Sequence, residues 1–76
     1  MTDAEARITA LEILVEQLIV ERCAMTDDPL GTAEQARDRL TAMAQADTTG
    51  RITHSVAAAL TDAMQRVVER IEGMAG

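Results

Sequence analysis

The sequence contains no phenylalanine, tyrosine, tryptophan or lysine. Because aromatic side chains bury the most area per residue, the core must be assembled from leucine, isoleucine, valine, methionine and alanine. The platforms on which single-stranded nucleic acid stacks are missing as well. The net charge is −6 at pH 7, and the seven arginines are spread along the chain. This charge disfavours binding to nucleic acid or to anionic membranes, since both surfaces are themselves negative.

Cysteine and histidine each occur once, as Cys23 and His54. One cysteine cannot form an intramolecular disulfide, and a zinc site needs about four cysteine or histidine ligands. A chain below roughly 80 residues has a core worth only about 3–5 kcal/mol, so it is usually reinforced by disulfides, a metal or a partner chain. Because the first two reinforcements are excluded, the sequence predicts association with another polypeptide.

Long apolar runs are also absent. No run approaches the roughly 20 residues that a membrane-spanning helix requires. The chain starts with Met-Thr-Asp-Ala-Glu, which is acidic where a secretory signal peptide is basic. We therefore expect a cytoplasmic protein that neither crosses nor binds a membrane.

Residues 3–25 have the pattern of a first helix. Thr2 and Glu5 have the spacing of a capping box, which marks a helix start. The residues that follow repeat at alternating intervals of three and four, as in the seam of a coiled coil. That seam consists of Ile8, Leu11, Val15 and Leu18, widened by Leu14 and Ile19.

The same helix has apolar side chains on a second side. At 100° per residue, Glu5, Glu12 and Glu16 form a narrow polar strip along one flank of the seam. Beyond that strip lies a second group of small and apolar residues: Ala6, Ala10, Ile13, Val20 and Ala24. A helix that is apolar on most sides is normally buried on most sides.

A second helix is predicted over about 33–46. Pro29 and Gly31 interrupt the chain before it, and Thr32 with Gln35 repeats the capping-box spacing. The apolar face is small and suits close packing against a larger helix. It consists of Ala33, Ala36, Leu40, Met43 and Ala44.

A third helix is predicted over about 52–72. Gly50 lies in the break before it, and Gly73 is placed as a C-terminal cap. Its seam consists of Leu60, Met64, Val67, Ile71 and Met74, broadened by Val56, Ala59 and Ala63.

These features predict an all-α fold with residues 1–76 in a single helical domain. We expect three helices or a helical hairpin, with a long first helix, bundled by homo-oligomerisation, because so short a chain cannot cover both apolar sides of its first helix. The expected partner is a second copy, in a homodimer or tetramer, and a different protein is the alternative. The predicted oligomer interface comprises Ile8, Leu11, Ile13, Leu14, Val15, Leu18, Val20, Leu60, Met64, Val67 and Ile71.

No set of residues indicates catalysis, a cofactor or a metal. A general base needs a positioned partner, and the neighbours of His54 in sequence would point in other directions on a helix. Asp27 and Asp28 lack the alternating ligands of a calcium loop, and no phosphate-binding glycine loop occurs. We therefore predict that the protein is not an enzyme and acts as an adaptor, a regulatory subunit or an assembly component.

The alternative function is that of a dimeric DNA-binding regulator. Residues 40–60 can be drawn as a helix-turn-helix motif, in which the start of the second helix contacts base edges. That start would offer Arg51, Thr53, His54 and Ser55. The acidic net charge of the chain weighs against this alternative.

Overall fold

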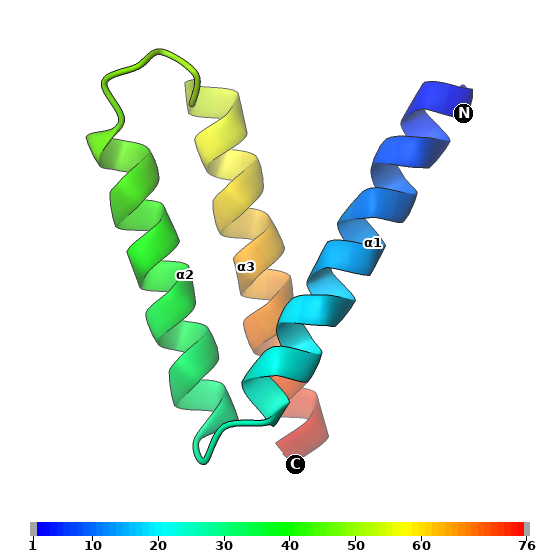
Figure 1. Cartoon of the computed structure of the whole chain (residues 1–76), viewed down its shortest axis with the longest axis vertical. Helices are drawn as coiled ribbons and strands as arrows, with labels where there is room; N and C mark the ends of the chain where they lie inside the picture. The colour runs from blue at the N-terminus through cyan, green and yellow to red at the C-terminus, as the bar shows by residue number, and fades with distance from the viewer. Residues whose placement is uncertain (1, 76) are drawn as a thin grey trace.

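The computed structural model describes residues 2–75, and over this range the chain is all-helical. Three helices follow one another, α1 (Asp3–Ala24), α2 (Pro29–Ala46) and α3 (His54–Ala75). Figure 1 shows α2 and α3 side by side and antiparallel, while α1 diverges from α3 toward its own N-terminal end. The prediction of an all-α fold of three helices is confirmed. The first helix is not distinctively long, because α1 and α3 each have 22 residues.

The predicted cap of α1 is present. The Thr2 side chain accepts a hydrogen bond from the backbone N–H of Glu5 at 3.1 Å. At the other end, the Thr26 hydroxyl donates to the Cys23 carbonyl at 2.7 Å and lies 2.9 Å from the Thr32 hydroxyl. These contacts tie the connection between α1 and α2 to both helices, so α1 is anchored at its C-terminal end.

The second helix begins at Pro29, four residues before the predicted start. Asp28 is the N-cap, and its carboxylate accepts a hydrogen bond from the Gly31 N–H at 3.0 Å. Proline is tolerated at the first position of a helix, where its missing N–H would have no partner. The capping-box spacing of Thr32 and Gln35 therefore does not mark the helix start.

The third helix is shifted toward the C-terminus relative to the prediction. Thr53 lies at its N-terminus and accepts a hydrogen bond from the Val56 N–H at 3.2 Å. The helix continues through Gly73 to Ala75. Gly73 therefore does not cap the helix, and Gly50 is the only glycine of the described residues with a positive φ, 79°.

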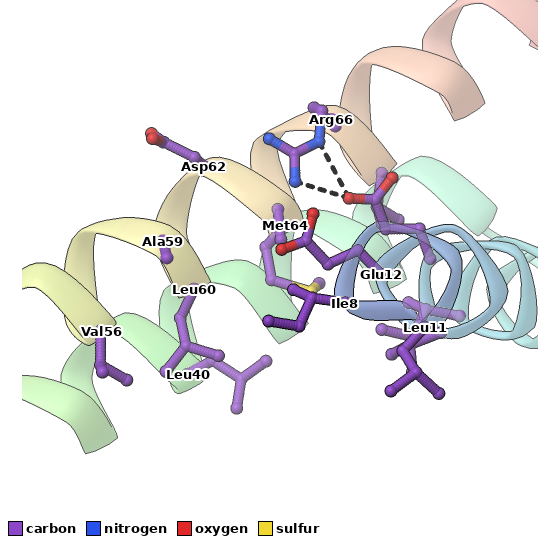
Figure 2. Close-up of a pocket in the computed structure, with 15 residues that line it drawn as sticks. Ile8, Leu11, Glu12, Leu40, Val56, Ala59, Leu60, Asp62, Met64 and Arg66 are labelled. Carbon is purple, nitrogen blue, oxygen red and sulfur yellow. Dashed lines mark hydrogen bonds and ion pairs between the residues drawn. The ribbon is translucent and has the colours of Figure 1, made fainter. Parts of the chain in front are cut away.

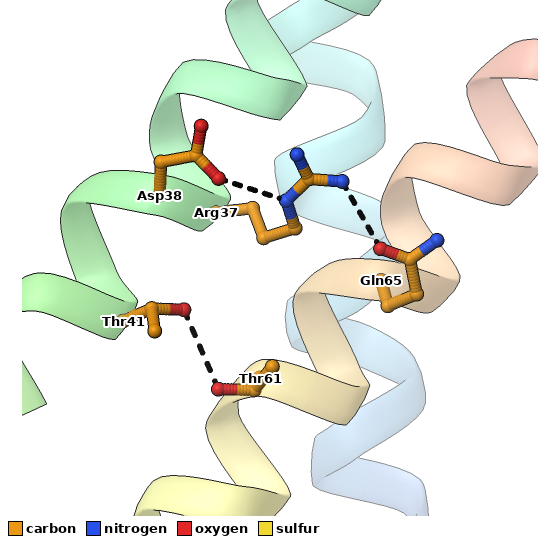
Figure 3. Close-up of polar contacts among 5 residues, drawn as sticks. All are labelled: Arg37, Asp38, Thr41, Thr61 and Gln65. Atoms are coloured by element: carbon orange, nitrogen blue, oxygen red, sulfur yellow. Dashed lines mark hydrogen bonds and ion pairs between the residues drawn. The ribbon is translucent and has the colours of Figure 1, made fainter.

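The most extensive helix pair is α2 with α3. Small residues on α2 allow close approach, since Ala33 and Ala44 are both buried. Polar contacts line the edge of this pair, as Figure 3 shows. Arg37 donates to Gln65 at 3.1 Å, and the hydroxyls of Thr41 and Thr61 lie 3.4 Å apart.

The hydrophobic core lies where the three helices converge, near the connection between α1 and α2. Its cluster of buried residues is Val20, Cys23, Ala33, Val67, Val68 and Ile71. Only the last turns of α1 belong to it. The radius of gyration is 13.5 Å, whereas a compact chain of this length has about 11 Å. The excess follows from the divergence of α1 in Figure 1.

Candidate protein-binding surface

The N-terminal two thirds of α1 carry large apolar side chains that the chain itself leaves uncovered. Six of them are between 52% and 64% exposed, and all but Ile13 lie on one side of the helix. At 100° per residue these five span about 120° of the helix surface without interruption by an acidic residue. We call them the α1 apolar face: Ile8, Leu11, Leu14, Val15 and Leu18.

A groove opens between α1 and α3. It has a volume of about 720 Å³, and the walls are mainly apolar. In Figure 2, Val56, Leu60 and Leu40 lie on one side of it, Ile8 and Leu11 on the other, and Met64 between them. Its apolar lining comes from all three helices: Ile8, Leu11, Val15, Ile19, Leu40, Val56, Ala59, Leu60, Ala63, Met64 and Val67.

An ion pair links α1 to α3 at the edge of this groove. Arg66 contacts the Glu16 carboxylate through Nε at 2.9 Å and through Nη2 at 2.7 Å. The hydrogen bond to Glu16 raises the pKa of the Arg66 guanidinium, and the charges of Glu12 and Asp62 add to this effect. The Arg66 side chain is half exposed while that of Glu16 is only 13% exposed. The rim therefore holds three carboxylates and one guanidinium.

The structure divides the predicted interface residues into two groups. Val20, Met64, Val67 and Ile71 are buried by their own chain and offer little surface to a partner. Met64 and Val67 form part of the groove floor, and Leu60, half-buried, belongs to its wall. The remaining predicted residues lie on α1 and are exposed.

Ile13 is exposed but lies outside the groove. Ile13 is 61% exposed, and its neighbour Leu14 is similarly exposed at 59%. At 100° per residue it lies about 140° around the helix from Ile8, on the second apolar side of α1. The two apolar sides that the sequence predicts are thus both present, and only one of them reaches the groove, through Ile8, Leu11 and Val15.

Some features of this surface were not predicted from the sequence. Two members of the glutamate strip, Glu12 and Glu16, line the groove toward α3, where Glu16 binds Arg66, although a strip of like charges is commonly a solvated face. Arg70 on α3 likewise donates to Gln17. The signal that could have revealed this is the four-residue spacing of Arg66 and Arg70, which puts both on one face of their helix.

The single cysteine and the single histidine lie in different surroundings. Cys23 is buried in the core near the end of α1. His54 is exposed at the start of α3, at the end of the molecule remote from that core (Figure 1). Among residues 2–75, no three potential ligands from His, Cys, Asp and Glu cluster around a common point. None of the helices α1 to α3 combines the length and the apolar character needed to span a bilayer.

The segment considered as a helix-turn-helix motif forms an antiparallel hairpin. Its two helices run side by side in Figure 1, whereas the helices of that motif cross at about 90–120°. The connecting loop is closed by Asp47, which accepts hydrogen bonds from the Thr49 hydroxyl at 2.8 Å and the Ile52 N–H at 3.3 Å. The segment therefore lacks the crossed helices of that motif.

Comparisons with protein-family models, with curated proteins and with solved structures found no match to this chain.

Proposed function

We propose that this protein is a self-associating helical interaction module, which acts by binding protein rather than by catalysis. The observation that carries the proposal is the α1 apolar face, whose five large side chains are all more than half exposed. Contiguous apolar patches on small proteins are commonly interaction sites. The homo-oligomer, as a dimer or a tetramer, is the form in which the protein is proposed to work.

The distribution of the core supports this proposal. The buried cluster is confined to one end of the molecule and consists largely of small side chains such as Ala33, Cys23 and Val67. A core of this size supplies little stability, and association is one of the few remaining ways to add to it. Burial of the α1 apolar face against another chain would extend the core along the whole helix.

The surroundings of the two most reactive side chains support binding rather than chemistry. Cys23 lies within the apolar core, where a thiol is inert. His54 lies on α3 at the opposite end of the molecule, so the two cannot act together. A protein-binding role requires neither of them.

The proposal is tested by the solution mass of the wild-type chain and of two variants at adjacent positions. We expect the wild-type chain to have two or four times the mass of 8.2 kDa. Leu14→Glu is expected to reduce the mass to that of one chain, because a carboxylate is costly to bury in an apolar interface. Ile13→Glu, with the same change at an equally exposed site, is expected to keep the oligomer.

The measurement is size-exclusion chromatography with light scattering and refractive-index detection, over a hundredfold range of concentration. Far-UV circular dichroism of each variant establishes that it remains helical. A wild-type chain that stays monomeric at every concentration would contradict self-association. Dissociation by Ile13→Glu but not by Leu14→Glu would move the interface to the other side of α1.

A further inference from the structure

We propose that the groove between α1 and α3 is filled by α1 of a second copy of this chain. The two copies do this reciprocally about a two-fold axis, so that each α1 contacts both α1 and α3 of the other copy. This inference rests on the proposed self-association. It adds that α3 forms half of the binding site, which a simple pairing of two α1 helices would not require.

The width of the α1 apolar face fits a helix that lies between two others. A two-helix coiled-coil seam uses a narrow stripe, whereas a helix packed into a groove must be apolar over at least about 100°. Leu14 extends the seam of α1 to about 120° at 100° per residue. The side of α1 near Ile8 and Val15 can then contact one helix of the partner while Leu14 and Leu18 contact the other.

The exposed area of the chain is large enough for this interface. The accessible surface is 5709 Å², whereas a compact monomer of this mass exposes about 4,500 Å². The excess of about 1,200 Å² exceeds the roughly 800 Å² per partner that a standard protein interface buries. A second copy that fills the groove would bury the accessible surface that the divergence of α1 exposes.

The charges of the groove rim and of the apolar sector of α1 are complementary. The rim carries Glu12, Glu16 and Asp62 with one arginine, Arg66. All five acidic residues of α1 lie outside its apolar sector, although the chain as a whole is strongly acidic. Within that sector the only charged residues are Arg7 and Arg22. A helix face that is apolar, basic and free of carboxylates suits an apolar groove with an acidic rim.

The inference is tested at Val56, which lines the groove from α3 and is 43% exposed in the chain itself. Val56→Glu puts a carboxylate into the groove. It also places glutamate three residues after Thr53, where it completes a capping box and favours α3. We expect the variant to fold while its dimer dissociates at least about tenfold more readily.

Ser55→Glu is the matched control. It adds the same charge to the same first turn of α3, but Ser55 is exposed and does not line the groove. Its dimer is expected to equal that of the wild-type chain. If Val56→Glu leaves the dimer as stable as Ser55→Glu does, while Leu14→Glu dissociates it, the groove is not occupied and self-association alone stands. A monomeric wild-type chain would overturn both proposals.

A second measurement identifies the occupant directly. In a mixture of two isotopically labelled forms of the full chain, filtered nuclear Overhauser effects report only contacts between copies. We expect contacts from the Val56 and Leu60 methyl groups of one copy to the Leu14 or Leu18 methyl groups of the other. Contacts between copies that are restricted to α1 with α1 would overturn the inference.

Discussion

At the scale of single residues, small side chains decide how closely the helices approach. Ala33 and Val67 are fully buried, and the core around them contains no side chain larger than isoleucine. Such residues allow backbones to approach closely but bury little area each. The loops, in contrast, are held by hydrogen bonds of polar side chains, and Asp47 is the clearest case.

The carboxylate of Asp47 is expected to titrate below its ordinary range. Donation by the Thr49 hydroxyl, and then by backbone N–H groups including that of Ile52, lowers the Asp47 pKa below 3.8. A lowered pKa in the folded state means that the ionised form stabilises the loop. That contribution is present above the unfolded pKa of about 3.9 and is lost as the pH falls through the folded value.

The measurement is a carbon-detected titration of the Asp47 carboxyl group between pH 2 and 6, with the Ile52 amide signal followed alongside. We expect the Ile52 amide to shift with the same midpoint as the Asp47 carboxyl. In Asp47→Asn, the Ile52 amide should no longer follow this midpoint. A pKa for Asp47 at or above 3.8 would contradict the hydrogen-bonded loop.

At the scale of elements, each helix start has a side-chain cap, and glycines have contrasting roles. Thr2, Asp28 and Thr53 each bind a backbone N–H three residues later. Gly50 has a positive φ in the loop before α3, whereas Gly73 lies inside α3. The same substitution at these two glycines should therefore have opposite effects.

Gly73→Ala is expected to raise the free energy of unfolding by up to about 0.5–1 kcal/mol, because glycine weakens a helix and a Cβ there meets no atom within 4 Å. Gly50→Ala is expected to lower it by about 1–2 kcal/mol, because alanine is disfavoured at positive φ. Urea unfolding followed by circular dichroism at 222 nm compares the two. If Gly73→Ala lowers the free energy of unfolding, Gly73 acts as a helix cap, as the sequence pattern predicts.

The helices themselves could be predicted from the sequence, because their apolar residues recur at helical intervals and Thr2 marks the first start. The start of α2 could not be predicted from the rule that proline breaks helices. Pro29 is instead accepted as the first residue of α2, where Asp28 caps the helix. The sequence also predicts that so short a chain cannot cover both apolar sides of its first helix, and the α1 apolar face is exposed. The groove could not be predicted, because it depends on the angle between α1 and α3, and the pairing of Arg66 with Glu16 between these helices is not evident from the sequence.

At the scale of the whole molecule, packing is uneven. The core lies at the end where the three helices converge (Figure 1). The groove begins beside that core, since Val67 belongs to both, and extends between α1 and α3 toward Ile8 and Val56. Regions with few buried apolar contacts open more readily than the core. The N-terminal part of α1 is therefore the least stabilised element of a single chain, and the one that gains most from a partner.

Thermal stability should consequently depend on protein concentration. If folded chains associate and unfolded chains do not, each tenfold dilution lowers the Tm by a few degrees. Leu14→Glu, which removes the association, should have a Tm that does not change with dilution. Differential scanning calorimetry across three decades of concentration measures both. A Tm of the wild-type chain that is independent of concentration would contradict coupling between association and stability.

The buried thiol of Cys23 is a probe of how often the core opens. It lies in the core, at the end where α1 joins the other two helices. A thiol reagent can reach it only when that junction separates, so the rate of labelling counts separation events. Since Cys23 is the only cysteine, the signal comes from a single position. Thiol labelling therefore measures how long the helix junction stays closed. It does not need aromatic fluorescence, which a chain without aromatic residues cannot give.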